Sequence, residues 1–483
     1  MLDNDSGGLL EMYVEAVPES FFAQLETDFH LPAGKRIFSL PLVVWLMILQ
    51  RLDPKATLST AVQQVIQQRP RALLSAHKRI REGTVSCHTG AYSDARHALP
   101  VEVAEKVADR VMEHLLRGHR EALPGWNRRA FILDGTSLEM PHSTDLVKAY
   151  PPHPKSHWPV LLMLVAQELT TGLAERPCWG PVYGPQTVSE QALTEQILDR
   201  IPVHSVLLGD INFGVFSVAY ATSRRGHDVL LRLQPNRAGV VGRGLPLCSG
   251  LDQSVCWRPS AHERKRHPGL PVDAVVQGRL IVQQVKASDG SSVVLYLFTT
   301  LPLTVEQLTQ LYGQRWNVET DLRSLKRTVD LQILRCRSAD MVAKELILAI
   351  TGYNLVRAVM NAAAQQHQLD PRRLSFSRSQ DVVNAALPAL SAARTQREYQ
   401  ARMRRMLQLV ASCKLPNRSS RRSTPRQVWG HGCKFTRRKI TTPNKIWFVR
   451  KNRGWTRVPA VCQVSGRARV RGSGRCGSRR IFS

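Results

Sequence analysis

The chain has 483 residues and 43% hydrophobic content, which is ordinary for a soluble globular protein and long enough for several domains. The formal net charge of +29 favours a polyanionic partner, most simply nucleic acid. The nine cysteines include no C-x-x-C pair, which argues against a zinc site and against a disulfide-rich secreted protein.

The positive charge is concentrated toward the carboxyl end. Residues 401–483 hold 23 Lys and Arg and no Asp or Glu, whereas the rest of the chain holds 44 basic and 38 acidic side chains. The N-terminus is acidic and lacks a signal pattern, and the most apolar run, Leu40–Leu49, is too short to span a bilayer. We therefore expect a cytoplasmic protein that does not enter a membrane.

Residues 1–120 predict a mostly helical region. Leu42–Leu52, Ala56–Gln68 and Val101–Leu116 have helical periodicity and are separated by prolines. A basic cluster at 77–81 is followed by a loop rich in Ser, Thr and Gly, a composition that suits phosphate contacts. A solvated helical cap on the core explains any single residue there equally well.

Two apolar runs end in an aspartate. Ala130–Leu133 precedes Asp134, and Val206–Gly209 precedes Asp210, a pattern typical of buried strands whose last side chain reaches solvent. Aspartate is also a common turn former after a strand, so neither residue is catalytic on this pattern alone.

The segments around these aspartates predict alternating strands and helices. Val160–Glu168 and Val229–Arg232 have the composition of core strands, whereas Ser189–Leu198 and Val215–Arg225 have helical spacing. Between about residue 236 and residue 300, β-rich runs alternate with Gly, Pro and Ser turns and with basic side chains.

The stretch 312–326, YGQRWNVETDLRSLK, places a carboxylate among permanent cations. On one continuous helix, four polar side chains of this stretch would share a face: Tyr312, Arg315, Glu319 and Lys326. The acid could bind a cation, and the Arg and Lys beside it suggest a bound anion, so the stretch suggests phosphate chemistry. Ordinary i,i+4 ion pairs on a solvated helix would give the same charge pattern.

The carboxyl-terminal part divides into a helical and an irregular segment. Val342–Ala362 is strongly apolar with helical character, and residues 366–410 predict further helices. After Arg426 the chain is rich in Arg, Gly and Ser and has no periodicity. It is either a disordered DNA-binding arm or the product of a shifted reading frame, and we expect no folded domain there.

Three motifs, DGTSLEMPHS, GDINFG and Y-x2-R-x3-E-x6-K, occur in this order. They resemble those of bacterial cut-and-paste transposases of the insertion-sequence-four family, which are DDE transposases with a Y-R-E-K signature. The resemblance covers roughly residues 30–425. It implies that the catalytic and metal-binding acids are Asp134, Asp210 and Glu319. It also implies a set of DNA- or phosphate-binding residues: Tyr312, Arg315, Lys326 and Arg232.

The resemblance implies an α/β fold, with an RNase H-like mixed-sheet catalytic core, an all-β insertion, and helical N-terminal and C-terminal regions. The parts that we expect are a helical DNA-end-recognition region (1–120), the catalytic core in two parts (121–235 and 301–362), the insertion (236–300), a helical C-terminal region (363–425) and a basic, disordered or frame-shifted tail (426–483). In the family the insertion contacts DNA, and Trp257 is either a stacking surface for an extruded base or a tryptophan packed under a β-turn.

Three carboxylates drawn together repel one another unless cations neutralise them. Two Mg²⁺ ions about 3.5–4 Å apart would do so, and Mn²⁺ could replace them. The implied function is that of an insertion-sequence transposase, a homodimer on double-stranded DNA that binds the terminal inverted repeats and the target and performs cleavage and strand transfer. Two alternatives stay open: an RNase H-like metal-dependent nuclease, and a catalytically inactive DNA-binding relic.

Overall fold

The computed structural model describes residues 8–31, 36–53, 55–118, 128–286, 292–315, 321, 324–325, 334–415, 447–451 and 454–458. The chain divides into two units, Met1–Asn417 and Arg418–Ser483. In the second unit the described residues form an antiparallel hairpin of β9 (Trp447–Lys451) and β10 (Gly454–Val458). The expectation of a disordered or frame-shifted tail stays a prediction, because most of 426–483 lies outside the described residues.

The amino-terminal part of the first unit is helical, as its periodicity predicts. Its helices are α1 (Leu9–Ala16), α2 (Glu19–Asp28), α3 (Leu40–Leu52), α4 (Leu58–Ile66), α5 (Lys78–Arg81), α6 (Gly90–Ala98) and α7 (Val101–Arg117), with a short 3-10 turn η1 (Arg71–Leu73). The start of α4 is fixed by a capping box between Thr57 and Thr60. Pro100 is the N-cap of α7, whose buried residues recur at helical spacing along one face.

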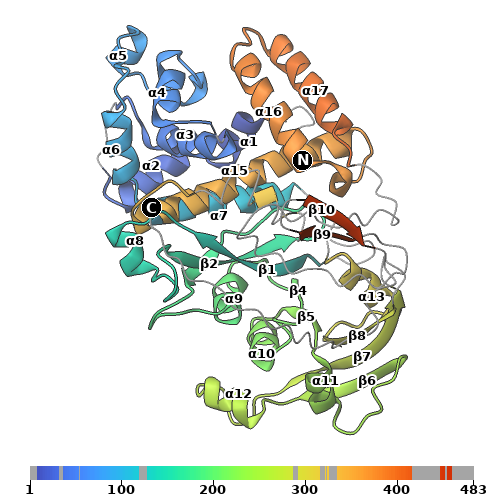
Figure 1. The fold of residues 1–483 in the computed structure, drawn as a ribbon. Helices are drawn as coiled ribbons and strands as arrows, with labels where there is room; N and C mark the ends of the chain where they lie inside the picture. The colour runs from blue at the N-terminus through green and yellow to red at the C-terminus, as the bar shows by residue number, and fades with distance from the viewer. Residues whose placement is uncertain are drawn as a thin grey trace. The chain divides into compact units, whose positions relative to one another are not determined.

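A mixed eight-stranded sheet, in the order β3-β2-β1-β4-β5-β8-β7-β6, forms the centre of the unit (Figure 1). Its strands are β1 (Ala130–Glu139), β2 (Val160–Glu168), β3 (Cys178–Pro181), β4 (Val206–Gly209), β5 (Asp228–Arg232), β6 (Leu251–Trp257), β7 (Val276–Lys286) and β8 (Ser292–Thr299). Strand β1 is antiparallel to β2 but parallel to β4, and β4 is parallel to β5. The first five strands thus have the order 3-2-1-4-5 with the second strand reversed, which is the RNase H-like arrangement that the motifs imply.

The insertion continues this sheet. Strand β8 pairs antiparallel with β5, and β7 and β6 follow on its other side. The expected all-β insertion also contains two short helices, α11 (Pro235–Gly242) and α12 (Ala261–Arg266). Both have start signals in the sequence: Pro235 in the first turn of α11, and a capping box between Ser260 and Glu263 at α12.

Helices cover both faces of the sheet. On one face, Ile132, Leu208 and Leu230 pack with the buried leucines of α13 (Val305–Gly313). The other face is covered by α9 (Glu190–Leu198), which contacts β1, β2 and β3, and by α10 (Phe216–Arg224), which contacts β5 and β7. Because successive side chains of a strand point to opposite faces of the sheet, the last two residues of each strand face different helical layers.

Helix α15 (Ala339–Gln366) is the central helix of the unit. It packs against α3, α7, α16 (Phe376–Ser391) and α17 (Gln396–Ser412), and α8 (Thr144–Ala149) lies near its amino end. In Figure 1, α3, α16 and α17 lie on one side of α15, and the sheet lies on its other side. It is long and apolar enough to cross a membrane, but 94% of its most apolar window is buried inside the fold. This burial is what the core helix of a globular protein requires.

A charged cluster joins α7 to the segment that precedes β3. Arg176 donates from Nε to Asp109 at 2.8 Å and also pairs with Glu105, and both acids belong to α7. The adjacent Glu175 is only 4% exposed. Burial raises the pKa of Glu175 to about 8, against the lowering effect of the neighbouring Arg200 guanidinium. Near neutral pH this side chain is therefore held mainly in its protonated form.

The raised pKa makes stability depend on pH. Because the folded protein binds the Glu175 proton more tightly than the unfolded chain, this group's contribution is complete below the ordinary glutamate pKa and is lost as the pH rises to about 8. We expect Glu175→Gln to remove a slope of up to about 1.4 kcal/mol per pH unit. Thermal midpoints measured from pH 5 to 9 should therefore favour the variant increasingly with pH. The same change at the exposed Glu19 serves as the control, and parallel curves for Glu175→Gln and the parent would contradict the prediction.

Candidate active site

Asp134 and Asp210 lie beside each other at the carboxyl ends of two adjacent parallel strands. The paired residues are Ala130 with Val206 and Ile132 with Leu208, so the same register carried two residues further brings Asp134 opposite Asp210. Neighbouring strands are about 4.8 Å apart. Ile132 and Leu208 face α13, and alternation directs both aspartates to that same face.

Arg232 extends this row onto the next strand. Leu208 pairs with Leu230 and Gly209 with Leu231, which places Arg232 opposite Asp210. At their carboxyl ends, β1, β4 and β5 thus carry Asp134, Asp210 and Arg232 side by side. The structure brings together five of the seven residues predicted as functional. Tyr312 reaches this row from the end of α13 and lies within electrostatic range of Arg232 and Asp210, and Arg315 lies within electrostatic range of Asp134 and Tyr312.

The expected continuous helix through the signature is interrupted. Helix α13 ends at Gly313, and the following amide groups of Gln314 and Arg315 bond back to the carbonyl groups of Leu311 and Tyr312. A glycine is a weak helix former, so an end at this position agrees with its conformational freedom. Tyr312 is therefore in the last turn of α13 and Arg315 follows it.

Two predicted site residues, Glu319 and Lys326, lie outside the described residues. Their assignment stays a prediction, and so does the meeting of Glu319 with the two aspartates.

On the opposite side of the row lies a carboxylate that the sequence did not indicate. Glu190, the first residue of α9, lies over Gly135, and a Cβ on Gly135 would be only 1.9 Å from Glu190 Oε1. Asn212 donates a side-chain hydrogen bond to Glu190, and its backbone N–H donates to Asp210 Oδ1 at 2.8 Å. The amide of Gly135 donates to Asp134 Oδ1 at 2.9 Å. The two motif aspartates and Glu190 are thus joined through their immediate neighbours.

The sequence contains only a weak signal for Glu190. It follows Ser189, an N-cap residue, so a glutamate in this first turn is explained by the helix dipole alone. Its proximity to Asp134 depends on the packing of α9 against β1, which no local pattern reveals.

The acids of this site are electrostatically strained. The pKa of Asp134 is raised to about 6, mainly by burial and also by the negative charges of Asp210 and Glu190, although the Gly135 amide and Arg315 oppose the shift. Burial likewise raises the pKa of Glu190, with a further contribution from Asp210. Burial also raises the pKa of Tyr312, against the lowering effect of Arg315 and Arg232. A bound cation would relieve the repulsion among the carboxylates.

The donor set fits a hard divalent cation. Asp134 and Asp210 offer carboxylate oxygens from adjacent strands, the type of ligand that Mg²⁺ and Mn²⁺ prefer. Within the part of the chain that the structure describes, no three acidic, His or Cys side chains are grouped closely enough to hold a metal ion. A complete site would therefore need a ligand from elsewhere, and Glu319 is the predicted one.

Trp257 is a core residue. It is 2% exposed and packs edge-on against Phe216 and Phe298, with ring centroids 5.9 and 4.8 Å away. Of its two interpretations, packing is therefore correct, because a ring enclosed by other rings has no free face for a base. An exposed tryptophan does occur in the loop before β2: Trp158 is 53% exposed.

The contact between Gly135 and Glu190 can be tested without measuring activity. We expect Gly135→Ala to lower the thermal midpoint, because the added methyl group displaces a carboxylate that Asn212 holds in place. Glu190→Ser should relieve this cost, with a coupling of about 1 kcal/mol in a double-mutant cycle measured by urea unfolding. Gly269→Ala is the control, because an added Cβ meets nothing within 4 Å there. Additive effects of the two changes would show that the contact does not exist.

The family of transposase DDE domains matches residues 125–355 of this chain. Transposase InsG for insertion sequence element IS4, from Escherichia coli (strain K12), is 27% identical over 305 residues, which are 61% of this chain and 66% of that protein. The chain thus spans just under two thirds of the length of this relative.

A solved structure of the piggyBac transposase synaptic complex with hairpin DNA has a TM-score of 0.40 and 10% identity to this chain, and the match covers 83% of this chain and 85% of that one. This likeness is distant, and the fold assignment rests on the strand order instead. The chain is thus similar to transposase DDE domains over residues 125–355 and to an insertion-sequence-four transposase over 305 residues.

Proposed function

We propose that this protein is the transposase of an insertion sequence, which binds the terminal inverted repeats of its element and catalyses metal-dependent DNA cleavage and strand transfer. The observation that carries the proposal is the pair of half-buried aspartates, Asp134 and Asp210, on adjacent parallel strands of an RNase H-like sheet. The match to transposase DDE domains over the same residues supports it.

The proposed cofactor is a pair of divalent ions, Mg²⁺ with Mn²⁺ as a substitute, held by Asp134, Asp210 and Glu319. Bound there, the ions would activate the attacking oxygen and stabilise the leaving oxygen of an in-line displacement at phosphorus. The raised pKa of Asp134 supports this role, because a carboxylate destabilised by burial and like charge gains most from a cation.

The cations beside this row are proposed to hold the scissile phosphate. Arg232 and Arg315 are half-buried, and both lie within electrostatic range of the buried Tyr312 hydroxyl group. A guanidinium can bind a phosphate with two parallel hydrogen bonds. Arg315, Arg232 and the Tyr312 hydroxyl would thus orient the phosphate, and Lys326 is the fourth proposed contact.

In the proposed reaction no protein side chain forms a covalent bond to DNA. Water first attacks the phosphodiester at the end of the element and releases a 3′-hydroxyl group. That hydroxyl then attacks another phosphodiester, which joins the element to new DNA. The nearby acids and guanidinium groups bind and orient the reacting groups at each step.

Two basic surfaces are proposed to bind the rest of the DNA. The insertion exposes Arg243, Arg258, Lys265 and Arg266, and the amino-terminal region exposes Lys78, Arg79 and Arg81 on α5. Lys and Arg side chains of this kind position a duplex through its phosphates. We propose that the protein acts in the cytoplasm as a homodimer on double-stranded DNA, with one copy for each end of the element.

Replacing either motif aspartate should separate binding from catalysis. We expect Asp134→Asn, Asp210→Asn and Glu319→Ala to lower the rate of Mg²⁺-dependent cleavage by roughly three orders of magnitude, a loss comparable with that of other groups that stabilise transition-state charge. Binding of terminal-repeat DNA in a mobility-shift assay should persist. Asp199→Asn, at an acid paired with Arg225 away from the site, should cleave normally. Parental cleavage by the aspartate variants would refute the assignment, and cleavage without strand transfer would favour the nuclease.

Arg315→Ala separates phosphate positioning from folding. We expect the variant to remain soluble with a thermal midpoint close to the parent's, because Arg315 is only half-buried. Its cleavage rate should fall by about tenfold to a hundredfold, since the reacting phosphate is no longer oriented. Single-turnover kinetics on pre-nicked and intact ends would measure this. An insoluble variant would instead identify Arg315 as a structural ion-pair partner.

A further inference from the structure

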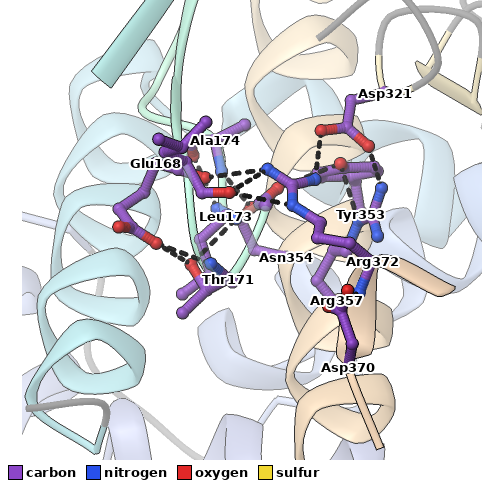
Figure 2. A network of polar contacts seen from close by, with 12 residues as sticks. Glu168, Thr171, Leu173, Ala174, Asp321, Tyr353, Asn354, Arg357, Asp370 and Arg372 are labelled. Carbon is purple, nitrogen blue, oxygen red and sulfur yellow. Dashed lines mark hydrogen bonds and ion pairs between the residues drawn. The ribbon is translucent and has the colours of Figure 1, made fainter. Parts of the chain in front are cut away.

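Asp321 lies in the signature segment, two residues after Glu319, and it is buried. Its exposed fraction is 1%. Its two carboxylate oxygens are divided between two cations: Oδ1 accepts from Arg357 of α15, and Oδ2 accepts from Arg372 of the short 3-10 turn η2 (Pro371–Arg373). Figure 2 shows the carboxylate between the two guanidinium groups.

Arg357 is itself held in place by aromatic contacts. Its Nε donates to the hydroxyl group of Tyr353 at 2.8 Å, and its guanidinium carbon lies 5.3 Å from the ring centroids of both Tyr353 and Phe376. The Tyr353 hydroxyl in turn donates to the carbonyl of Gly172 at 3.0 Å. These contacts orient the guanidinium group independently of Asp321.

Arg372 joins the same carboxylate to the connection between β2 and β3. It donates to the carbonyl groups of Leu169, at 2.9 Å from Nε, and Glu168, at 3.2 Å from Nη2. Gly172, whose φ is +75°, leaves room for it, because a Cβ there would lie 2.6 Å from Arg372 Nη1. The side chain of Asn354 bonds to both the N–H and the carbonyl of Ala174, which ties this connection to α15 (Figure 2).

Burying three charged side chains here costs desolvation free energy that apolar side chains in the same space would not cost. Desolvating a carboxylate and two guanidinium groups costs several kcal/mol per ion, and well-packed apolar side chains often stabilise a fold equally well. What the charges supply is direction, because hydrogen bonds from two fixed guanidinium groups define the position of the carboxylate in a way that apolar contacts do not. Two residues of chain span at most about 7 Å, so fixing Asp321 restricts the location of Glu319.

We propose that Asp321, Arg357 and Arg372, here called the signature clamp, are positioning residues that hold the segment carrying Glu319 against α15 and the β2–β3 connection. The clamp does not touch the DNA or the reacting atoms. It acts by limiting where the Glu319 carboxylate can lie relative to Asp134 and Asp210. This inference rests on the proposed catalytic role of Glu319.

The sharpest test is Asp321→Glu, which keeps the charge and lengthens the side chain by one methylene group. The single-turnover cleavage rate at saturating terminal-repeat DNA should fall by about tenfold to a hundredfold, as for a misplacement of about 1 Å. The dissociation constant for that DNA should stay within about twofold, because the clamp lies away from the proposed binding surfaces. Backbone amides of residues 314–333 should exchange hydrogen faster than in the parent.

The matched control is Glu345→Asp. It changes the length of a buried acid by one methylene group in another ion pair, Arg51–Glu345, which joins α3 to α15. Its cleavage rate and its exchange at residues 314–333 should equal the parent's. If Asp321→Glu does not fold, Arg372→Lys is the second variant. It keeps the charge but removes the planar guanidinium that binds Asp321 and the Leu169 carbonyl at the same time, and it is expected to show the same fall in rate and faster exchange.

The outcomes separate the two claims. If the parent does not cleave terminal-repeat DNA with Mg²⁺ or Mn²⁺, the proposed function fails, and the exchange measurement still decides whether the clamp fixes the segment. If the parent cleaves and the folded clamp variant has parental rate and parental exchange, the clamp inference is overturned. Equal losses in the clamp variant and in Glu345→Asp would also overturn it, because they would reflect general destabilisation.

Discussion

The repulsion between two carboxylates on adjacent strands governs the arrangement of the site. The parallel register of β1 and β4 places Asp134 and Asp210 about one strand spacing apart, where burial disfavours the charge of Asp134. The surrounding cations partly offset this repulsion: Arg232 ends the next strand, and Arg315 follows α13. The remaining imbalance is what the proposed divalent cations would relieve.

At the carboxyl ends of β1 and β4, the two faces of the sheet carry different charges. On the side of α13 lie a buried phenol and two guanidinium groups, which suit an anion. On the side of α9 lies Glu190, held over Gly135 by Asn212. The insertion is continuous with this edge, because Arg232 of β5 pairs with Leu297 of β8. Strand β8 of the insertion is therefore joined by backbone hydrogen bonds to the strand that ends in Arg232.

Helix α15 is apolar by composition, yet each of its buried charges holds a different segment. Lys344 donates to the carbonyl groups at the end of α6, at 3.3 and 3.2 Å. Glu345 pairs with Arg51 of α3, and Arg357 pairs with Asp321 in the signature segment. A buried charge must find a specific partner or lose several kcal/mol. The helix thus holds both the amino-terminal helices and Asp321 of the signature segment through directional ion pairs and hydrogen bonds as well as through apolar burial.

The sequence by itself determined the strands β1, β2, β4 and β5, the helical amino-terminal region and the two motif aspartates, because period-2 and period-3.6 patterns and turn signals are local properties. The motifs at fixed spacing also indicated the resemblance to insertion-sequence transposases, with which the matches to transposase DDE domains and to InsG agree. The tertiary structure alone decided that the signature helix ends at Gly313, that Trp257 is enclosed by other rings, and that Glu190 and the Asp321 ion cluster lie where they do. These features depend on contacts between residues far apart in the chain. Neither residue type nor periodicity encodes which buried acid will meet which cation.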